Sequence, residues 1–286
     1  MKNEVSLPVP GAYPIIYRLQ RMIEFIKQLF RTRYVLRVLI FRDFQSRYLA
    51  SYLGLPWAFI QPLIYVIVIW FAFTFGLRAG AREDGTAFVP WLLAGLIPWM
   101  FMSQTIFHSC NSLGEYSYLI KKTKFNVAFI PLIKIFSGMI IHCVLIFISL
   151  CLFVFKFGIT PSIYWIQLLY YFFAMFILLA GIGWFVASVN VFIKDIVHLV
   201  NIIVSIFFWA TPILWSYSML EGNLKYIALL NPFFYITEGY RYTFLENRWF
   251  FEFPEMNIYF WGVTLVLLFL GIYTFQKLKP DFGDEL

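Results

Sequence analysis

The sequence predicts an all-α integral membrane protein with six transmembrane helices, an amphipathic helix before the first and short re-entrant helices before the last. Of the 286 residues, 62% are hydrophobic and 13% are charged, whereas ordinary soluble domains are roughly 25% charged. The charges are also unevenly placed, because six long runs contain almost none. We therefore interpret residues 1–286 as one membrane domain without a soluble part.

The N-terminal helix is predicted over residues 14–50, where apolar residues recur at helical spacing opposite basic ones. This pattern is typical of a helix lying in the headgroup layer of a membrane. Such a helix is either a lipid anchor alone or an element that transmits force from a cytosolic partner. The pattern leaves both functions open.

Six runs reach the roughly 20 residues that a helix needs to cross ~30 Å of hydrocarbon. They cover residues 55–77, 87–111, 127–156, 162–193, 196–218 and 256–277. An even number of crossings places both ends of the chain on one side. Sixteen Lys and Arg residues then share the side of the termini and six fall on the other, so both termini are predicted to be cytoplasmic.

The missing motifs exclude most enzyme classes. The chain contains no Gly-Lys pair and therefore no phosphate-binding loop of the G-x-x-x-x-G-K type. It also lacks metalloprotease, hydrolase and Cys/His ligand patterns, which predicts neither a catalytic site nor a metal site. The three histidines, on separate spans or span ends, are interpreted as satisfied interior polar groups: His108, His142 and His198.

The charge pattern restricts both the partners and the energy source. The net charge of +7 reflects the cytoplasmic excess and favours membrane lipids over nucleic acid, because no soluble basic domain exists. Every carboxylate lies outside the apolar runs, which disfavours coupling to protons or sodium. The energy must then come from elsewhere, most economically from an ATPase on another chain.

Two segments between the spans suggest functions. Residues 112–126 are predicted to form a short cytoplasmic coupling helix that seats in a groove of the ATPase, although an ordinary solvated loop fits as well. Its candidate residues are Glu115, Tyr116, Leu119, Lys121 and Lys122.

Residues 222–250 are predicted to form two short outer helices divided at Asn231-Pro232, because proline disfavours helix in the residue before it. Glu238 and Arg241 are three apart and can pair on one helical face. A re-entrant path of this kind requires shielding by protein or a wet cavity. The alternative is a loop that only closes the fold and has no gating function.

Several blocks together resemble a known family. They are RDFQSRYLASYLGLPWAFIQPLIYVIVIWFAFTFGLR from Arg42, VPWLLAGLIPWMFMSQTIFHSCNSL from Val89, LIKKTKFNVAFIPL from Leu119, ATPILW from Ala210 and LNPFFYITEGYRYTFLENRWFFE from Leu230. In this order they resemble the permease subunit of ABC-2 type polysaccharide exporters, over about residues 20 to 278. The last two blocks and the YFW at Tyr259 look most similar to the wall teichoic acid exporters, in a family that also includes O-antigen and capsule exporters.

The resemblance implies a type V exporter-like fold in the plasma membrane of a bacterium. It implies a homodimer bound to two copies of a nucleotide-binding subunit, which holds ATP and Mg, so that this chain needs no cofactor. The implied substrate is a polymer linked to undecaprenyl diphosphate. The implied outer gate includes Phe233, Phe234, Tyr235, Glu238 and Arg241.

A long polymer requires a continuous path, and aromatic side chains offer flat surfaces over which sugar or polyol units slide. The candidate lining residues are Trp57, Phe59, Tyr65, Trp70, Phe73, Phe207, Phe208, Trp209 and Trp215. Each of these also suits helix packing or an interfacial belt. Arg42 and Arg47 are candidates for attracting the lipid diphosphate at the entrance, and they suit pairing with bilayer lipid or the ATPase equally.

Two other functions are compatible with parts of the pattern. A small-molecule efflux permease of the same class would share the fold and the ATPase partner. A membrane-embedded transferase for lipid-linked sugars is disfavoured, because no polar catalytic residues gather at one membrane face.

Overall fold

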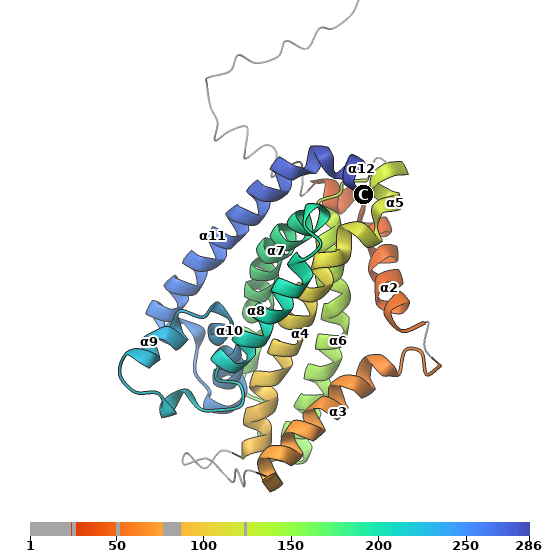
Figure 1. The fold of residues 1–286 in the computed structure, drawn as a ribbon. Coiled ribbons are helices and arrows are strands. Elements are labelled where there is room, and N and C mark those ends of the chain that lie inside the picture. Colours follow the sequence, from red (N-terminus) through yellow and green to blue (C-terminus); the bar gives the residue numbers. More distant parts are fainter. Residues whose placement is uncertain (1–23, 25–26, 50–51, 77–86, 123–124) are drawn as a thin grey trace, which may run out of the picture.

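The computed structural model describes residues 24, 27–49, 52–76, 87–122 and 125–286, and these residues form an all-helical bundle (Figure 1). The longer helices are α2 (Arg33–Leu49), α3 (Trp57–Phe71), α4 (Phe88–Glu115), α6 (Phe129–Phe155), α7 (Leu168–Phe192), α8 (Ile196–Ala210) and α11 (Pro254–Leu278). The shorter α-helices are α5 (Ser117–Lys122), α9 (Asn223–Leu229), α10 (Pro232–Arg241) and α12 (Phe282–Glu285). Short 3₁₀ or π segments are η1 (Ala72–Gly76), η2 (Ile163–Gln167), η3 (Tyr217–Met219), η4 (Tyr242–Glu246), η5 (Phe250–Glu252) and η6 (Lys279–Asp281). The first part of the predicted helix over 14–50 lies outside the described residues.

Within the described part of the chain, five helical stretches are long and apolar enough to cross a membrane. They are Trp57–Gly76, Phe88–Glu115, Phe129–Phe155, Ile163–Phe192 and Pro254–Glu285. The predicted fifth span over 196–218 is helical only in α8, whose fifteen residues measure about 22 Å at 1.5 Å per residue. It ends early because Thr211 precedes a proline and is extended, with φ −86° and ψ 133°. The sixth crossing stays a prediction.

Helix α4 is the centre of the bundle. In its apolar 18-residue stretch, 83% of the residues are buried, whereas only 17% and 22% are buried in the corresponding stretches of α3 and α11. Helices α6, α7, α8 and α10 all pack against α4. The exposed apolar surfaces of α3 and α11 are suited to lipid or to another protein chain.

Helix α11 packs along α7 through a pair of glycines. A Cβ atom on Gly181 would lie 2.7 Å from the Cα of Leu268, and a Cβ on Gly271 would overlap the carbonyl group of Gly181. Small residues let membrane helices approach this closely. In Figure 1, α11 follows α7 along one edge of the bundle.

The short elements gather in two places. Helices α2, α5 and α12 lie together at one end of the bundle, which includes the C-terminus (Figure 1). A second apolar core, with Leu39, Leu113, Tyr116, Phe275 and Phe282 among its members, joins them there. Helices α9 and α10 lie in the opposite half, where α10 packs against α4 and α9 packs against α10.

Candidate functional site

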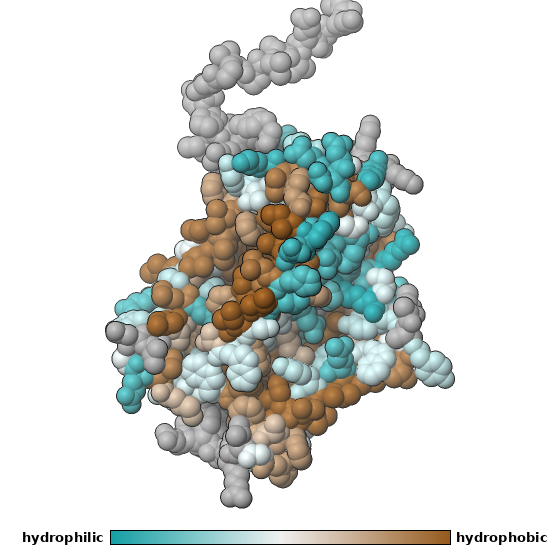
Figure 2. Space-filling view, in the orientation of Figure 1, coloured by the Kyte–Doolittle hydropathy of each residue, from teal (hydrophilic) through white to brown (hydrophobic). Residues whose placement is uncertain are grey.

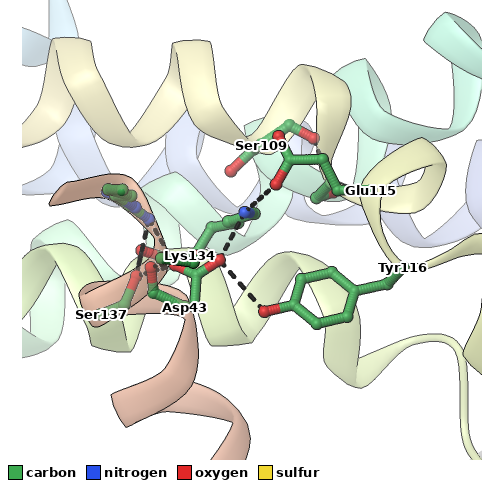
Figure 3. Close-up of polar contacts among 9 residues, drawn as sticks. Asp43, Ser109, Glu115, Tyr116, Lys134 and Ser137 are labelled. Atoms are coloured by element: carbon green, nitrogen blue, oxygen red, sulfur yellow. Dashed lines mark hydrogen bonds and ion pairs between the residues drawn. The ribbon is translucent and has the colours of Figure 1, made fainter. Parts of the chain in front are cut away.

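A buried polar cluster joins three elements at the end of the bundle that holds α2 and α5 (Figure 3). Helix α2 contributes Asp43 and Arg47, which are four residues apart and therefore share a face. The end of α4 contributes Glu115 and the adjoining Tyr116, and α6 contributes Lys134 and Ser137. We call these six residues the inner cluster.

Asp43 is the centre of the inner cluster. Its Oδ1 accepts hydrogen bonds from Lys134 Nζ at 2.5 Å and from Tyr116 Oη at 3.1 Å. Its Oδ2 accepts from Arg47 Nη2 at 2.7 Å and from Ser137 Oγ at 2.5 Å. The second carboxylate, Glu115, accepts from Lys134 Nζ at 2.5 Å. One carboxylate thus ties α2 to α6 and to the junction after α4.

The charges of the inner cluster balance. Two carboxylates face one lysine and one arginine, and the side chains of Asp43 and Lys134 are each 2% exposed. Burial alone would raise the pKa of Asp43, but Arg47, Lys134 and the hydrogen bonds outweigh it, so its pKa lies below 3.8. Burial, followed by the negative charge of Asp43, raises the pKa of Tyr116. The carboxylate therefore stays ionised and the phenol stays a donor at neutral pH.

A second buried cluster surrounds Arg241 on α10. Arg241 is 1% exposed, and its Nη1 donates to Glu238 Oε1 at 2.5 Å and to the carbonyl oxygen of Pro212 at 2.6 Å. Its Nη2 donates to the carbonyl oxygen of Ile213 at 3.0 Å, and its guanidinium carbon lies 3.7 Å from the ring centre of Trp91. The predicted Glu238–Arg241 pair is formed, and Arg241 fastens α10 to α4 and to the segment after α8. We call these five residues the outer cluster.

The start of α10 is fixed to the same segment. Asn231 caps the helix, because its Oδ1 accepts from the backbone N–H of Phe233 at 2.9 Å. Its Nδ2 donates to Thr211 Oγ1 at 2.7 Å. The polar groups at the two X-Pro turns, Thr211-Pro212 and Asn231-Pro232, are thereby paired with each other.

Helix α10 lies alongside the first part of α4. The ring of Phe233 at its start meets Trp99 at 5.6 Å, and Arg241 at its end meets Trp91. Trp99 is eleven residues into α4, or about 16 Å at 1.5 Å per residue. Helix α10 therefore reaches about two fifths of the way along the 28-residue helix α4.

A polar connection inside the bundle leads from the inner cluster to α10. A cavity of about 10 Å³, large enough for one water molecule, is lined by Arg47, Gln104, Thr105 and His142 among others. Among the described residues, Thr105 Oγ1 and His142 Nδ1 have no hydrogen-bond partner. On its other side, His142 Nε2 bonds the hydroxyl of Tyr240 on α10 at 2.8 Å.

The comparisons with known proteins identify the family. Residues 34–245 match the ABC-2 type transporter family. The chain belongs to this family. Two relatives from Klebsiella pneumoniae, both named O-antigen export system permease protein RfbA, are 27% and 26% identical to this transporter chain over 262 residues, covering 88% of it and 95% of each relative. A relative of the same name from Myxococcus xanthus is 24% identical over 272 residues, covering 93% of the chain and all of the relative.

In this ABC-2 transporter chain, the predicted coupling residues occupy two environments. Glu115 and Tyr116 belong to the inner cluster, and Tyr116 is buried. Leu119 is partly buried and packs against the second core. Lys121 is exposed at the end of α5, and the side chain of Lys122 lies outside what the structure describes.

The two arginines predicted at the entrance differ in how exposed they are. Arg42 is exposed on α2. Arg47 donates through Nη2 to Asp43 and to Ser137 Oγ at 2.6 Å, and its side chain is only 12% exposed. Of the predicted gate residues, the rings of Phe233, Phe234 and Tyr235 are buried in the core.

The candidate lining aromatics are spread over exposed and packed positions. Trp57, Tyr65 and Trp209 are exposed, and Trp215 is half-buried and donates to the carbonyl oxygen of Trp209 at 3.0 Å. The others are partly buried against the core: Phe59, Trp70, Phe73, Phe207 and Phe208.

The sequence did not predict the structural role of three residues of the inner cluster: Asp43, Lys134 and Ser137. The available signal was Lys134, a lone charge inside the apolar run of α6. A charge at such a position requires a buried partner. Its partner Asp43 lies 91 residues away, and nothing in the sequence pairs the two.

Proposed function

We propose that this chain is the membrane-spanning subunit of an ATP-driven exporter that moves a lipid-linked glycopolymer from the cytoplasm to the outer face of the bacterial plasma membrane. The subunit acts as a homodimer with two copies of a nucleotide-binding subunit, on which ATP and Mg are bound. The family membership and the absence of a phosphate-binding loop from the sequence support the assignment of transport and ATP hydrolysis to two separate chains.

The observation that carries the proposal is the inner cluster. It joins the segment predicted to meet the ATPase, residues 112–126, to α6 through the Glu115–Lys134 ion pair and to α2 through the buried hydrogen bond from Tyr116 to Asp43. Tyr116 and Asp43 are both buried, and leaving a buried polar group unpaired is costly, so a displacement of Tyr116, directly before α5, moves the bundle along with it. The outer cluster and His142–Tyr240 carry this displacement on to α10, the proposed exit gate.

Two polymers are candidates for the cargo. The motif spelling of the last two blocks favours wall teichoic acid. The names of the three relatives, all O-antigen export permeases, favour an O-antigen type polysaccharide. Arg42 at the exposed face of α2 is the proposed contact for the lipid diphosphate, since a guanidinium binds phosphate oxygens in a bidentate manner.

The test is co-purification and coupling of the complex. Wild-type protein is expected to bring down an ATPase from native membranes and to support export in proteoliposomes. Replacing Lys121 and Lys122 with alanine removes charges from the segment proposed to meet the ATPase, and should reduce ATPase capture without lowering thermal stability. Lys277 and Lys279, exposed at the same end, provide the matched control pair. If both pairs behave like wild type, residues 112–126 do not form the ATPase contact.

A further inference from the structure

A groove between α3 and α4 has no role in either cluster. Its volume is about 230 Å³, and its lining includes Gln61 and Tyr65 from α3 and Trp99, Met100, Ser103 and Gln104 from α4. Both helices are among the candidate membrane spans. Of the groove residues from α3, only Tyr65 is among the channel-lining candidates predicted from the sequence.

The groove presents hydrogen-bonding groups that the protein itself does not use. The amides of Gln61 and Gln104, the phenol of Tyr65 and the indole N–H of Trp99 have no hydrogen-bond partner within the described residues. Ser103 Oγ donates to the carbonyl oxygen of Met100 at 3.2 Å and keeps its acceptor capacity. Unused amides in membrane spans are costly to retain and mark binding sites.

The groove carries no formal charge. Its lining residues are amides, hydroxyls, aromatic rings and apolar groups. Arg47 borders the adjoining small cavity together with Gln104 and is paired with Asp43. Uncharged donors and acceptors beside aromatic faces suit hydroxyls and C–H faces, whereas a chain of phosphates requires cationic partners.

The groove lies on a polar route along the open face of α4. Gln104, His108 and Asn111 follow at i, i+4 and i+7 and are all partly exposed. Asn201 and Ser205 are exposed on the neighbouring α8. Figure 2 shows a hydrophilic strip beside the hydrophobic ridge of α8 in this region. At the far end, Trp99 contacts Phe208 of α8 and Phe233 of α10, so the groove adjoins the proposed gate.

We propose that this groove is a subsite for an uncharged, hydroxyl-rich repeat unit of the exported polymer. Gln61 and Gln104 bind its hydroxyls, while Trp99 and Tyr65 contact the faces of its rings. This inference rests on the proposed export function and adds the class of repeat unit, a neutral glycan rather than a polyol phosphate.

The test uses the complete complex with its ATPase in proteoliposomes and two probes on the same undecaprenyl diphosphate lipid. One probe is an oligomannan and the other a poly(glycerol phosphate) of matched length. The double variant Gln61→Leu, Gln104→Leu removes both amides at similar volume and should lower oligomannan export at limiting substrate about tenfold, the effect of losing one or two neutral hydrogen bonds. Gln276→Leu, on the exposed surface of α11, is the matched control and should export like wild type.

The outcomes separate the two proposals. If the double variant exports oligomannan at the wild-type rate, the groove is not a subsite, while the export function stands. If the wild type exports poly(glycerol phosphate) faster than oligomannan, the inference of a neutral repeat unit is overturned. If the wild-type complex hydrolyses ATP and exports neither probe, the proposed function itself fails. Should the double variant unfold, the single Gln61→Leu variant, at an exposed position, gives the same test.

Discussion

Gly95 on α4 is required by the position of Arg241. A Cβ atom at Gly95 would lie 2.6 Å from Nη2 of that arginine, which is held in place by four acceptors. We expect Gly95→Ala to destabilise the fold by about 1–3 kcal/mol, measured as the thermal unfolding midpoint in detergent. Gly114→Ala is the control on the same helix, because nothing lies within 4 Å of its Cβ position. Equal midpoints for the two variants would contradict the packing described around Arg241.

Substitutions of Asp43 and Glu115 are expected to differ sharply in their cost to stability, although both side chains contact Lys134. Asp43→Asn leaves two buried cations without their main counter-charge and should cost about 3–5 kcal/mol. Glu115 is 50% exposed, so Glu115→Gln should cost about 0–1 kcal/mol. Chemical denaturation of the purified variants measures both values. Similar losses would show that Asp43 is not the centre of the inner cluster.

The pH dependence of the inner cluster follows from the lowered pKa of Asp43. A carboxyl whose folded pKa lies below 3.8 contributes stability that is fully present above that value and is lost as the pH falls through the folded pKa. We expect the stability difference between wild type and Asp43→Asn to be constant from neutral pH down to about pH 5 and to shrink only below pH 3.8. A difference that vanishes near neutral pH would contradict the assigned ion pairs.

The contact between α6 and α10 depends on one hydroxyl. Tyr240→Phe leaves His142 Nε2 without its partner in a fully buried position, and an unpaired buried polar group costs about 1–3 kcal/mol. Tyr171→Phe is the matched control, because Tyr171 is equally buried and its hydroxyl makes no hydrogen bond within the described residues. The thermal midpoint should fall for the first variant and stay near wild type for the second.

The helices were largely predictable from the sequence, because charge-free runs of sufficient length form helices in a membrane. The division of the outer segment into α9 and α10 also followed from Asn231-Pro232. The early end of α8 was not predicted, although Thr211-Pro212 is the same kind of signal. The run around this proline is apolar throughout, so hydropathy alone predicts that the helix continues past it.

The sites were predictable only where their partners are close in sequence. Glu238 and Arg241 are three residues apart, and their pairing was foreseen. The pairs Asp43–Lys134 and His142–Tyr240 are separated by more than ninety residues, and only the packing of α2, α6 and α10 brings them together. Gln61 and Gln104 were overlooked because single amides barely change the hydropathy of a span.

The complete transporter is expected to contain more than this chain. The exposed apolar faces of α3 and α8 and the lack of a phosphate-binding loop in the sequence fit a dimer bound to a separate ATPase. Native mass spectrometry of the complex from its own membranes should give two copies of each chain. A complex with a single copy of this chain would contradict the homodimer and the path it encloses.

The central claim is that the inner cluster transmits the work of the ATPase to the bundle. The most direct measurement is the amount of polymer exported per ATP hydrolysed in proteoliposomes, compared for wild type and Asp43→Asn at a temperature at which both are folded. Asp284→Asn, an exposed carboxyl at the same end of the bundle, is the control. We predict that Asp43→Asn keeps its ATPase partner and hydrolyses ATP but loses most of its export, while the control matches wild type. Unchanged export per ATP in Asp43→Asn would contradict the claim.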